Sequence, residues 1–357
     1  MLILSAPAFA GAQLCLDNTG KLHANRDLHE SSVGGGMKRK AGYTLLGVAL
    51  VIAGLSLFNA SWLAGRPAGR LSLIAHRGSG LPLVPNAPGD CSARNVVPGT
   101  QSNLVENSAG AFTRAVRDGA QGLMLDVRTT SDGRAVIFRD PRLECRTNGT
   151  GAVAERDLAY LKTLDIGYGY SADGGRTFPT RGLAIGAMPT VEDVLAFYRH
   201  VVLIFDLPDV RTAEAVVAAF QRAGVQIGPN HGFSGPPEAR ARLRQLTQGG
   251  FILDNAASEA CTAPYRKTGW LGLVPGECNG ATLILDRNGS FTLWGWPYRF
   301  MARMSGAGAR FFIAGDDSNG DHWVGLTQPE QLGEVPHDYP GMLLVEDMDN
   351  VGRALVR

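Results

Sequence analysis

The chain has 357 residues, of which 45% are apolar and 19% are charged, so it can bury a full-sized core and is not expected to be disordered. Its 34 basic and 33 acidic residues give a formal net charge of +1, which provides no excess of one sign for binding nucleic acid or another polyanion. A charged small molecule would therefore be recognised by a local group of charges.

The first 36 residues differ in character from everything that follows. Met1–Ala12 is apolar without a basic start, and Cys15–Gly36 is polar and ends in glycines. Met37 is followed by three basic residues and an apolar run, which is typical of an export signal. This pattern suggests the hypothesis that residues 1–36 are a leader that is not translated and that Met37 is the true start.

An uncharged apolar segment follows these basic residues. The run at about 42–64 is long enough to cross the hydrocarbon layer of a bilayer as a helix. Basic residues favour the cytoplasmic side, so we predict a signal anchor over 37–69 that leaves the remainder extracytoplasmic, either periplasmic or extracellular. A cleavable signal peptide is the alternative, although Trp62 and Leu63 interrupt the small residues that cleavage requires.

After Arg70, short apolar runs alternate with helical patterns, which indicates βαβ units and buried parallel strands. Eight runs fit a TIM (β/α)8 barrel over residues 70–357, and a doubly wound open sheet remains an alternative on pattern alone. The eight are Leu71–Ala75, Leu123–Val127, Ala135–Phe138, Val201–Phe205, Phe251–Leu253, Thr282–Leu285, Ala309–Ile313 and Met342–Val345. Val225–Ile227 is a weaker ninth candidate, which leaves the numbering of the strands open.

Polar motifs follow the first three runs. The first run ends in His-Arg-Gly at 76–78, and after an insertion Glu-Asn at 106–107 opens a helix. The second run contains Asp126 and leads to Asp-Gly at 132–133, and the third ends in Arg-Asp at 139–140. In their order and spacing, these motifs resemble those of the glycerophosphodiester phosphodiesterase family. Segments 164–175, 188–190 and 293–297 resemble a bacterial branch of it, so the similarity covers nearly everything after residue 70.

The resemblance implies a barrel of the PLC-like phosphodiesterase type that hydrolyses a glycerophosphodiester to glycerol 3-phosphate and an alcohol, a step of lipid metabolism. Such hydrolysis requires charge neutralisation on phosphate, with an acid and a base on opposite sides of phosphorus. By position, His76 matches one of two catalytic histidines, and Arg77 matches the arginine that meets the phosphate. Glu106, Asp126 and Asp206 match carboxylates that hold a divalent cation, Ca2+ or Mg2+.

Two positions depart from the family pattern. Met124 stands where the family has a second acidic metal ligand two residues before the aspartate, and Arg139 replaces the second catalytic histidine. A thioether is a poor ligand for a hard cation, and an arginine stays protonated at working pH. We therefore expect a divergent member with a degenerate active site, as in a pseudoenzyme. Its hydrolytic activity and its binding of a divalent cation are expected to be weak or lost.

Several alternatives stay open at this point. His76 taken alone could be a satisfied core residue, and Asp126 could form a structural salt bridge with Arg139. Trp294 and Trp296 could line a substrate channel or pack the barrel rim. A non-catalytic barrel that binds a phosphodiester or lipid head group at the cell envelope is the alternative function. A lyase that forms a cyclic phosphate is a third possibility, and His231 is a candidate substitute acid.

Four of the five cysteines follow the apolar segment, and an even number suits disulfides in an oxidising compartment. No C-x-x-C motif or Cys/His cluster indicates zinc. Three pairings are formally possible, and we favour Cys91 with Cys145 and Cys261 with Cys278.

Overall fold

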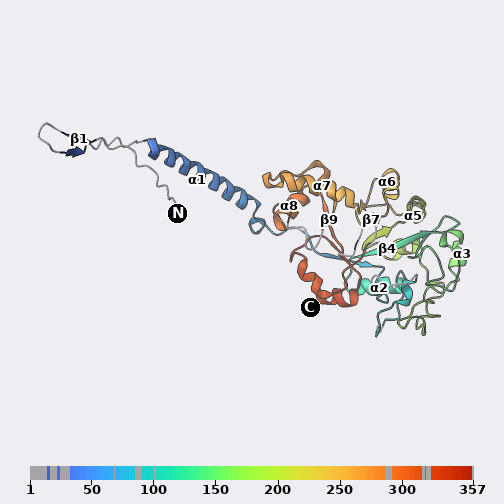
Figure 1. Ribbon diagram of the computed structural model, residues 1–357. Helices are drawn as coiled ribbons and strands as arrows, with labels where there is room; N and C mark the ends of the chain where they lie inside the picture. The colour runs from blue at the N-terminus through green and yellow to red at the C-terminus, as the bar shows by residue number, and fades with distance from the viewer. Residues whose placement is uncertain are drawn as a thin grey trace, which may run out of the picture. The chain divides into compact units, whose positions relative to one another are not determined.

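The computed structural model describes residues 14–16, 22–24, 33–67, 69–84, 91–99, 102–285, 292–315, 318 and 323–355. The chain divides into two units, Met1–Ser56 and Leu57–Arg357 (Figure 1). Most of the predicted leader therefore lies outside the described residues.

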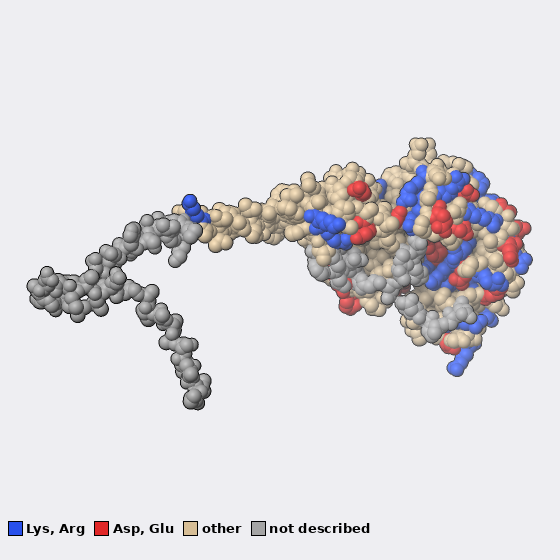
Figure 2. All heavy atoms as spheres, turned by 45° about the horizontal axis from the view of Figure 1, so that its top comes forward, with Lys and Arg blue, Asp and Glu red and all other residues tan. Residues whose placement is uncertain are grey.

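The first unit contains one long helix, α1, which begins at Val33 and whose last residues belong to the second unit. Strands β1 (Leu14–Leu16) and β2 (Leu22–Ala24) pair antiparallel before it. Within α1 (Val33–Asn59), the 20 residues Lys40–Asn59 have a mean hydropathy of 2.0, long and apolar enough to cross a membrane. On the face seen in Figure 2, neither blue nor red atoms interrupt this part of the helix after its basic start. The helix ends at Asn59, so residues 60–64 of the predicted segment lie outside it.

The second unit is built around a nearly closed barrel of eight parallel strands, which confirms the predicted fold class. Its strands are hydrogen-bonded in the order β8-β7-β6-β4-β3-β11-β10-β9, and the two ends of this path share no ladder among the described residues. The strands are β3 (Ser72–His76), β4 (Gly122–Thr129), β6 (Val202–Asp206), β7 (His231–Ser234), β8 (Phe251–Ile252), β9 (Thr282–Leu285), β10 (Arg310–Ile313) and β11 (Met342–Val345).

Two strand predictions are wrong. The run at 135–138 does form a strand, β5 (Ala135–Ile137), but it pairs antiparallel with β4 as a hairpin and is no barrel strand. The eighth barrel strand is instead β7, whose sequence His-Gly-Phe-Ser has no apolar run that could be recognised. The weak candidate Val225–Ile227 is not a strand but part of the loop that leads into β7.

Helices cover the outside of the barrel. Polar residues in the loops before several of these helices cap the first turn of the helix. Ser108, Thr190, Asp209 and Asp254 each accept a hydrogen bond from a backbone N–H of the helix that they precede. The helices are α2 (Ala109–Arg117), α3 (Leu158–Leu161), α4 (Val191–Phe197), α5 (Val210–Arg222), α6 (Pro237–Leu246), α7 (Asn255–Thr268), α8 (Tyr298–Gly306) and α9 (Arg353–Leu355).

Two long insertions form a small core of their own beside the barrel mouth. This core contains Leu81, Val96 and Val105 from the first insertion, and Leu143, Leu161 and Tyr170 from the segment after β5. The predicted disulfide Cys91–Cys145 joins the two insertions, and Cys261–Cys278 joins α7 to the 3-10 helix η5 (Gly276–Cys278), so both predicted pairings are confirmed.

Candidate active site

At the carboxyl ends of the barrel strands, polar side chains replace the apolar layer that fills the barrel. The layer below includes Ile74, Met124, Ile204 and Leu344. Side chains alternate along a strand, so the residue two positions further on also points into the barrel. In five strands that position is polar, and the five residues are His76, Asp126, Asp206, Ser234 and Glu346.

The loop after β3 is held in an unusual backbone conformation. Arg77 has a φ of 61°, its N–H donates to the Met124 carbonyl over 2.8 Å, and its carbonyl accepts from Asn107 over 2.9 Å. Gly78 follows with a φ of 84°, and a Cβ there would lie 2.8 Å from the carbonyl carbon of Ala111. Glycine therefore lets the loop pack directly on the first turn of α2.

The guanidinium of Arg77 is the centre of the site and is bound by three carboxylates. Its Nε donates to Asp126 Oδ2 over 2.8 Å, and its Nη1 donates to Glu346 Oε1 over 3.0 Å. The same Nη1 lies 3.6 Å from Glu106 Oε2. Although burial opposes it, these carboxylates raise the pKa of Arg77. Arg77 is therefore already neutralised by protein groups, whereas the resemblance assigns it to substrate phosphate.

His76 is oriented by a carboxylate that sequence analysis missed. Its Nδ1 lies 2.7 Å from Glu346 Oε2, which leaves Nε2 free to meet a reacting group. Burial would raise the pKa of Glu346, but His76 and Arg77 lower it to about 2. Glu346 follows Leu344 by two residues, as His76 follows Ile74, so the same alternation could have identified it.

The two aspartates on β4 and β6 are neighbours with opposite electrostatic environments. Asp126 and Asp206 are paired in register across the two strands. Asp126 accepts from Arg77 and from Asn107 Nδ2, each over 2.8 Å, and despite burial its pKa lies well below the usual range. Burial and the charge of Asp126 raise the pKa of Asp206 to about 6. The carboxylate of Asp206 is thus not paired with a cationic side chain among the described residues.

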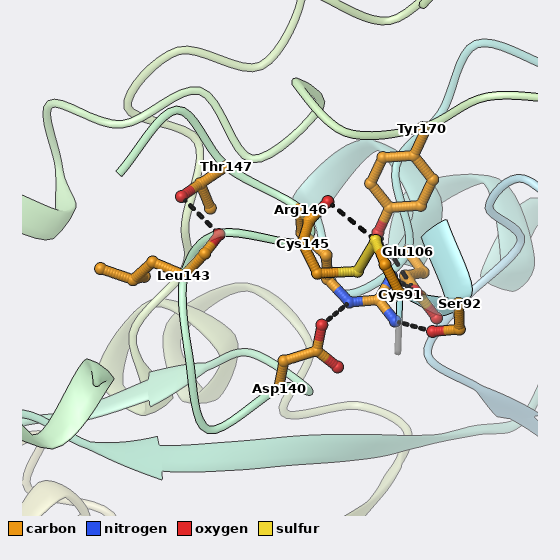
Figure 3. The surroundings of a disulfide bond; sticks show 9 residues. All are labelled: Cys91, Ser92, Glu106, Asp140, Leu143, Cys145, Arg146, Thr147 and Tyr170. Carbon is orange, nitrogen blue, oxygen red and sulfur yellow. Dashed lines mark hydrogen bonds and ion pairs between the residues drawn. A yellow bond between two sulfur atoms is a disulfide. The ribbon is translucent and has the colours of Figure 1, made fainter. Parts of the chain in front are cut away.

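A second arginine, Arg146, holds Glu106 from the other side (Figure 3). Its Nη1 donates to Glu106 Oε1 and, over 2.8 Å, to the Tyr170 hydroxyl, which itself donates to Glu106 over 3.1 Å. Its Nε lies 2.9 Å from Asp140 Oδ2. Burial would raise the pKa of Glu106, but Arg146 and then Arg77 lower it overall. Arg146 directly follows Cys145, and no motif pointed to it.

Arg139, which the resemblance places at the position of the second catalytic histidine, is a cation of the site without a protein anion among the described residues. Among the described residues, its guanidinium makes no hydrogen bond or ion pair, and only its carbonyl is bound, by Arg128. Burial, and next the positive charge of Arg77, lower its pKa. The alternative in which Asp126 pairs with Arg139 is wrong, because Arg77 takes that carboxylate.

The residues expected to hold a divalent cation do not fit one as they are arranged. Glu106 and Asp126 bind arginines, and Met124 is fully buried in the apolar layer of the barrel. In the described part of the chain, no group of three or more His, Cys, Asp or Glu side chains is arranged to hold a metal ion. Arg77 supplies the positive charge that a cation would bring.

A cavity of about 170 Å³ opens directly above His76 and Arg77. One wall is apolar and comes from the first insertion, while the opposite wall is polar and comes from the loops around β11. The lining residues are Leu81, Pro82, Leu83 and Val97 on the first wall, Thr327, Gln328, Asp347 and Asn350 on the second, and Glu106 and Glu346 at the base. This arrangement suits a small polar ligand with an apolar end.

The remaining predicted site residues lie elsewhere. Trp294 and Trp296 do not line this cavity; the indole N–H of Trp294 donates to the Arg266 carbonyl, and Trp296 contacts Phe300 at 5.8 Å between ring centroids. His231 begins β7, so it lies at the amino end of the barrel, away from His76, and stacks edge-on against Phe220. Its candidacy as a substitute acid is therefore wrong.

Comparisons with a family model and with curated relatives point to the same family. Residues 92–222 match the model of the glycerophosphoryl diester phosphodiesterase family. A glycerophosphodiester phosphodiesterase of Caldanaerobacter subterraneus is 39% identical over 83 residues, which are 23% of this chain and 34% of the relative. A putative glycerophosphodiester phosphodiesterase of Bacillus subtilis is 33% identical over 112 residues, 30% of this chain and 42% of the relative. The chain thus spans between a third and a half of the length of these two curated relatives.

Solved structures agree on the fold. A glycerophosphoryl diester phosphodiesterase domain from Mycobacterium tuberculosis superposes with a TM-score of 0.54 at 19% identity, over 78% of this chain and 97% of that one. A glycerophosphodiester phosphodiesterase from Agrobacterium tumefaciens gives a TM-score of 0.51 at 18% identity, over 80% and 100%. At such identities the likeness supports the barrel alone.

Proposed function

Because this chain belongs to the glycerophosphodiester phosphodiesterase family, we propose that its barrel binds a glycerophosphodiester, or the head group of a glycerolipid, in the cavity above His76. We further propose that it hydrolyses this ligand weakly or not at all. The observation that carries both statements is the pairing of a well-oriented histidine, His76 on Glu346, with an arginine in place of its catalytic partner.

The chemistry available to the site supports only half of a hydrolysis. Water attacks phosphorus, one group takes the proton from that water, and another gives a proton to the departing alkoxide. His76 can perform one of these transfers through Nε2. Arg139 can stabilise negative charge but cannot exchange a proton at working pH, and the missing transfer costs roughly 10²–10⁴ in rate.

Phosphate binding is better supported than catalysis. Arg77 has three carboxylate partners, whereas the guanidinium of Arg139 has none among the described residues. A phosphate anion would complete the environment of Arg139 without displacing any protein carboxylate. A metal-independent binder of phosphodiesters is therefore the second candidate function. Arg139 does not line the cavity above His76 but lines a smaller space that shares Glu106 with it, so the phosphate would have to reach past Glu106.

Members of this family are typically metal-dependent, and the proposal departs from the family on this point. Glu106 and Asp126 are neutralised by Arg146 and Arg77. Calcium or magnesium would have to displace a buried guanidinium from each carboxylate, which leaves that arginine without an anion. We propose that binding of the phosphodiester needs no divalent cation.

The location also follows as a proposal. One apolar helix near the N-terminus is long enough to anchor the chain in a membrane. Three basic residues lie at the start of its apolar part, and two disulfides lie after it, which supports a barrel on the extracytoplasmic side. The ligand would then be a glycerophosphodiester of the envelope.

The proposal is tested with the purified full chain in detergent micelles. Binding of glycerophosphocholine and glycerophosphoethanolamine is measured by calorimetry, and release of glycerol 3-phosphate is measured in calcium, magnesium or chelator. We expect binding that survives the chelator and is weakened at least about tenfold by Arg139→Met, since a charge-assisted hydrogen bond is lost. Any release of glycerol 3-phosphate should be lost in His76→Ala and kept in His231→Ala, which is the matched control because His231 lies at the amino end of the barrel. Rapid hydrolysis that the chelator abolishes would contradict the proposal.

A further inference from the structure

The residues that follow the apolar span carry exposed apolar side chains. Leu57–Asn59, the last three residues of α1, belong to the second unit, and the 3-10 helix η1 (Ser61–Leu63) comes directly after them. Phe58 and Leu63 are about half exposed, and Trp62 is 74% exposed. Single exposed apolar side chains are common, but a contiguous group of them marks a site that contacts a partner or a membrane.

A second exposed apolar group lies at the end of α7. It consists of Trp270, Leu271 and Leu273 in and after the 3-10 helix η4 (Gly269–Leu271), together with Trp294 from the segment before α8. Leu273 is 57% exposed, and each of the others is more than a third exposed. Figure 1 shows α7 and α8 side by side, and Tyr265 and Phe300 link them with ring centroids 5.4 Å apart.

Hydrogen bonds join these two groups into one surface. Asn59 Nδ2 donates to the Trp270 carbonyl over 2.9 Å, and Arg303 Nη1 donates to Asn59 Oδ1 over 3.0 Å. Gly272, with a φ of 78°, lies so close to the Phe58 ring that a Cβ would meet it at 2.8 Å. We call this surface the junction face, and its members are Phe58, Trp62, Leu63, Trp270, Leu271, Leu273 and Trp294.

The polar atoms of the two barrel tryptophans in the junction face are satisfied by the backbone. Trp270 Nε1 donates to the Lys267 carbonyl over 3.1 Å, and Trp294 Nε1 donates to the Arg266 carbonyl over 2.8 Å. Their rings are therefore free to present apolar surface. The side chains of Lys267 and Arg266 are exposed next to them, although Arg266 also pairs with Glu259. Aromatic rings beside basic side chains are typical of the interface between lipid and water.

The position of the span says what covers this surface. Twenty helical residues, Lys40–Asn59, rise about 30 Å in all, which equals the hydrocarbon thickness of a bilayer. If the span crosses the membrane, as proposed above, then Asn59 lies at the boundary of the hydrocarbon. Trp270 is hydrogen-bonded to Asn59 and must lie within a few ångströms of the same boundary.

We infer that the junction face is embedded in the head-group layer of the bilayer, so that the barrel is seated on the membrane surface and does not hang from a free tether. The occupant is lipid, because the surface is continuous with the membrane span itself. Burial of these apolar side chains among lipid head groups and upper acyl chains removes them from water. Trp294 accordingly belongs to a lipid-facing surface and not to a substrate channel.

The test uses the full chain reconstituted into vesicles of phosphatidylcholine and anionic phosphatidylglycerol, with phosphatidylcholine brominated near the carbonyl as a quencher of tryptophan fluorescence. Wild type is compared with Trp62→Phe, Trp270→Phe, Trp294→Phe and Trp323→Phe. The control, Trp323, is buried among the apolar residues that fill the barrel. We expect the quenchable emission to fall in each of the first three variants and to stay unchanged in Trp323→Phe.

A second comparison separates lipid contact from a general effect of surface mutations. Leu271→Asp with Leu273→Asp should abolish quenching of Trp270, while Leu183→Asp with Ile185→Asp should not. The control pair is more exposed, at 62% and 65% against 48% and 57%, and lies in the insertion after β5. If only Trp62 is quenched, the span crosses the bilayer but the barrel stands clear of it, and the inference is overturned. If no tryptophan is quenched, the membrane span fails as well.

Discussion

At the level of single residues, the site is organised by the guanidinium of Arg77, whose carboxylate partners include two that the sequence predicts as cation ligands. Arg77 is bound by Asp126, Glu346 and Glu106, and Arg146 takes the remaining oxygen of Glu106. A buried carboxylate without such a partner would be costly to ionise. Asp206 has no arginine partner among the described residues, and burial and the charge of Asp126 raise its pKa.

This difference between the two aspartates gives a prediction about stability and pH. The folded pKa of Asp206 is about 6, against an ordinary value of 3.8. The folded state therefore pays to ionise it above pH 6, and this penalty disappears as the pH falls toward 3.8. Asp206→Asn should stabilise the chain by roughly 1–3 kcal/mol at pH 7.5 and by almost nothing at pH 4.

Asp126→Asn is the matched control, because Asp126 is its neighbour in register and has the opposite shift. Its depressed pKa contributes stability above pH 3.8 that is lost only in stronger acid, so this variant should be destabilised at both pH values. Denaturant unfolding of the full chain in micelles at pH 4 and 7.5 measures both. Equal effects of the two substitutions at pH 7.5 would contradict the electrostatic description.

A second prediction concerns Met124, which is fully buried in the apolar layer directly below Asp126. Met124→Glu should destabilise the chain by about 2–4 kcal/mol in chelator, because a carboxylate is buried without a partner. Combined with Arg139→His, the added carboxylate offsets the charge of a bound cation, so Arg77 and Arg146 can keep anionic partners. Calcium or magnesium should then restore hydrolysis and raise the melting temperature. Either substitution alone leaves one requirement unmet and should restore little activity.

Met342→Glu serves as the control for this experiment. Met342 lies in the same interior cluster but begins β11, at the amino end of the barrel and away from Glu106 and Asp126. It should destabilise comparably and show no rescue by metal. Metal rescue in both variants would indicate unspecific binding to a new carboxylate.

At the level of elements, sequence patterns predicted most of the barrel because buried parallel strands are apolar in sequence. They failed at β7, where Gly232 and Ser234 point inward, and at β5, whose apolar residues serve a hairpin beside the barrel. His76 and Asp126 could be found because they lie in local motifs, and both line the mouth of the barrel. The roles of Glu346 and Arg146, and the ion pairs of Arg77, depend on contacts between segments far apart in the chain. No local sequence pattern encodes these contacts.

The disulfides belong to this scale, since each joins two elements. Cys91–Cys145 closes 54 residues and fixes the loop in which Ser92 and Arg146 are hydrogen-bonded, whereas Cys261–Cys278 closes 17. In the chain-entropy model, loss of the first should cost about 4 kcal/mol and loss of the second about 3 kcal/mol. The paired alanine variants are compared by denaturant unfolding.

Only the first disulfide should also affect the site. Without it, the loop that carries Arg146 is less constrained, and Glu106 loses its firmest partner. Ligand binding should therefore weaken in Cys91→Ala with Cys145→Ala and stay unchanged in Cys261→Ala with Cys278→Ala. Equal weakening in both variants would mean that general instability, and not the position of Arg146, controls binding.

For the molecule as a whole, the remaining question is which side of a membrane the barrel occupies. Lys38, Arg39 and Lys40 lie at the start of the apolar span, and basic residues near a span favour the cytoplasmic side. The two disulfides favour the same orientation, because they form and persist in an oxidising compartment. Two independent features thus predict an extracytoplasmic barrel.

The last prediction combines both features in one experiment. In a bacterial host, protease added to intact spheroplasts should digest the barrel, and its four cysteines should resist alkylation. Replacing Lys38, Arg39 and Lys40 by glutamine removes the charge bias, so a fraction of the chains should insert with the opposite orientation. In that fraction the barrel should be protected from protease, and Cys91, Cys145, Cys261 and Cys278 should be reduced and alkylated. Protection of the unmodified barrel in intact spheroplasts, with digestion only after lysis, would reverse the assigned side, because protease reaches only what lies outside the membrane.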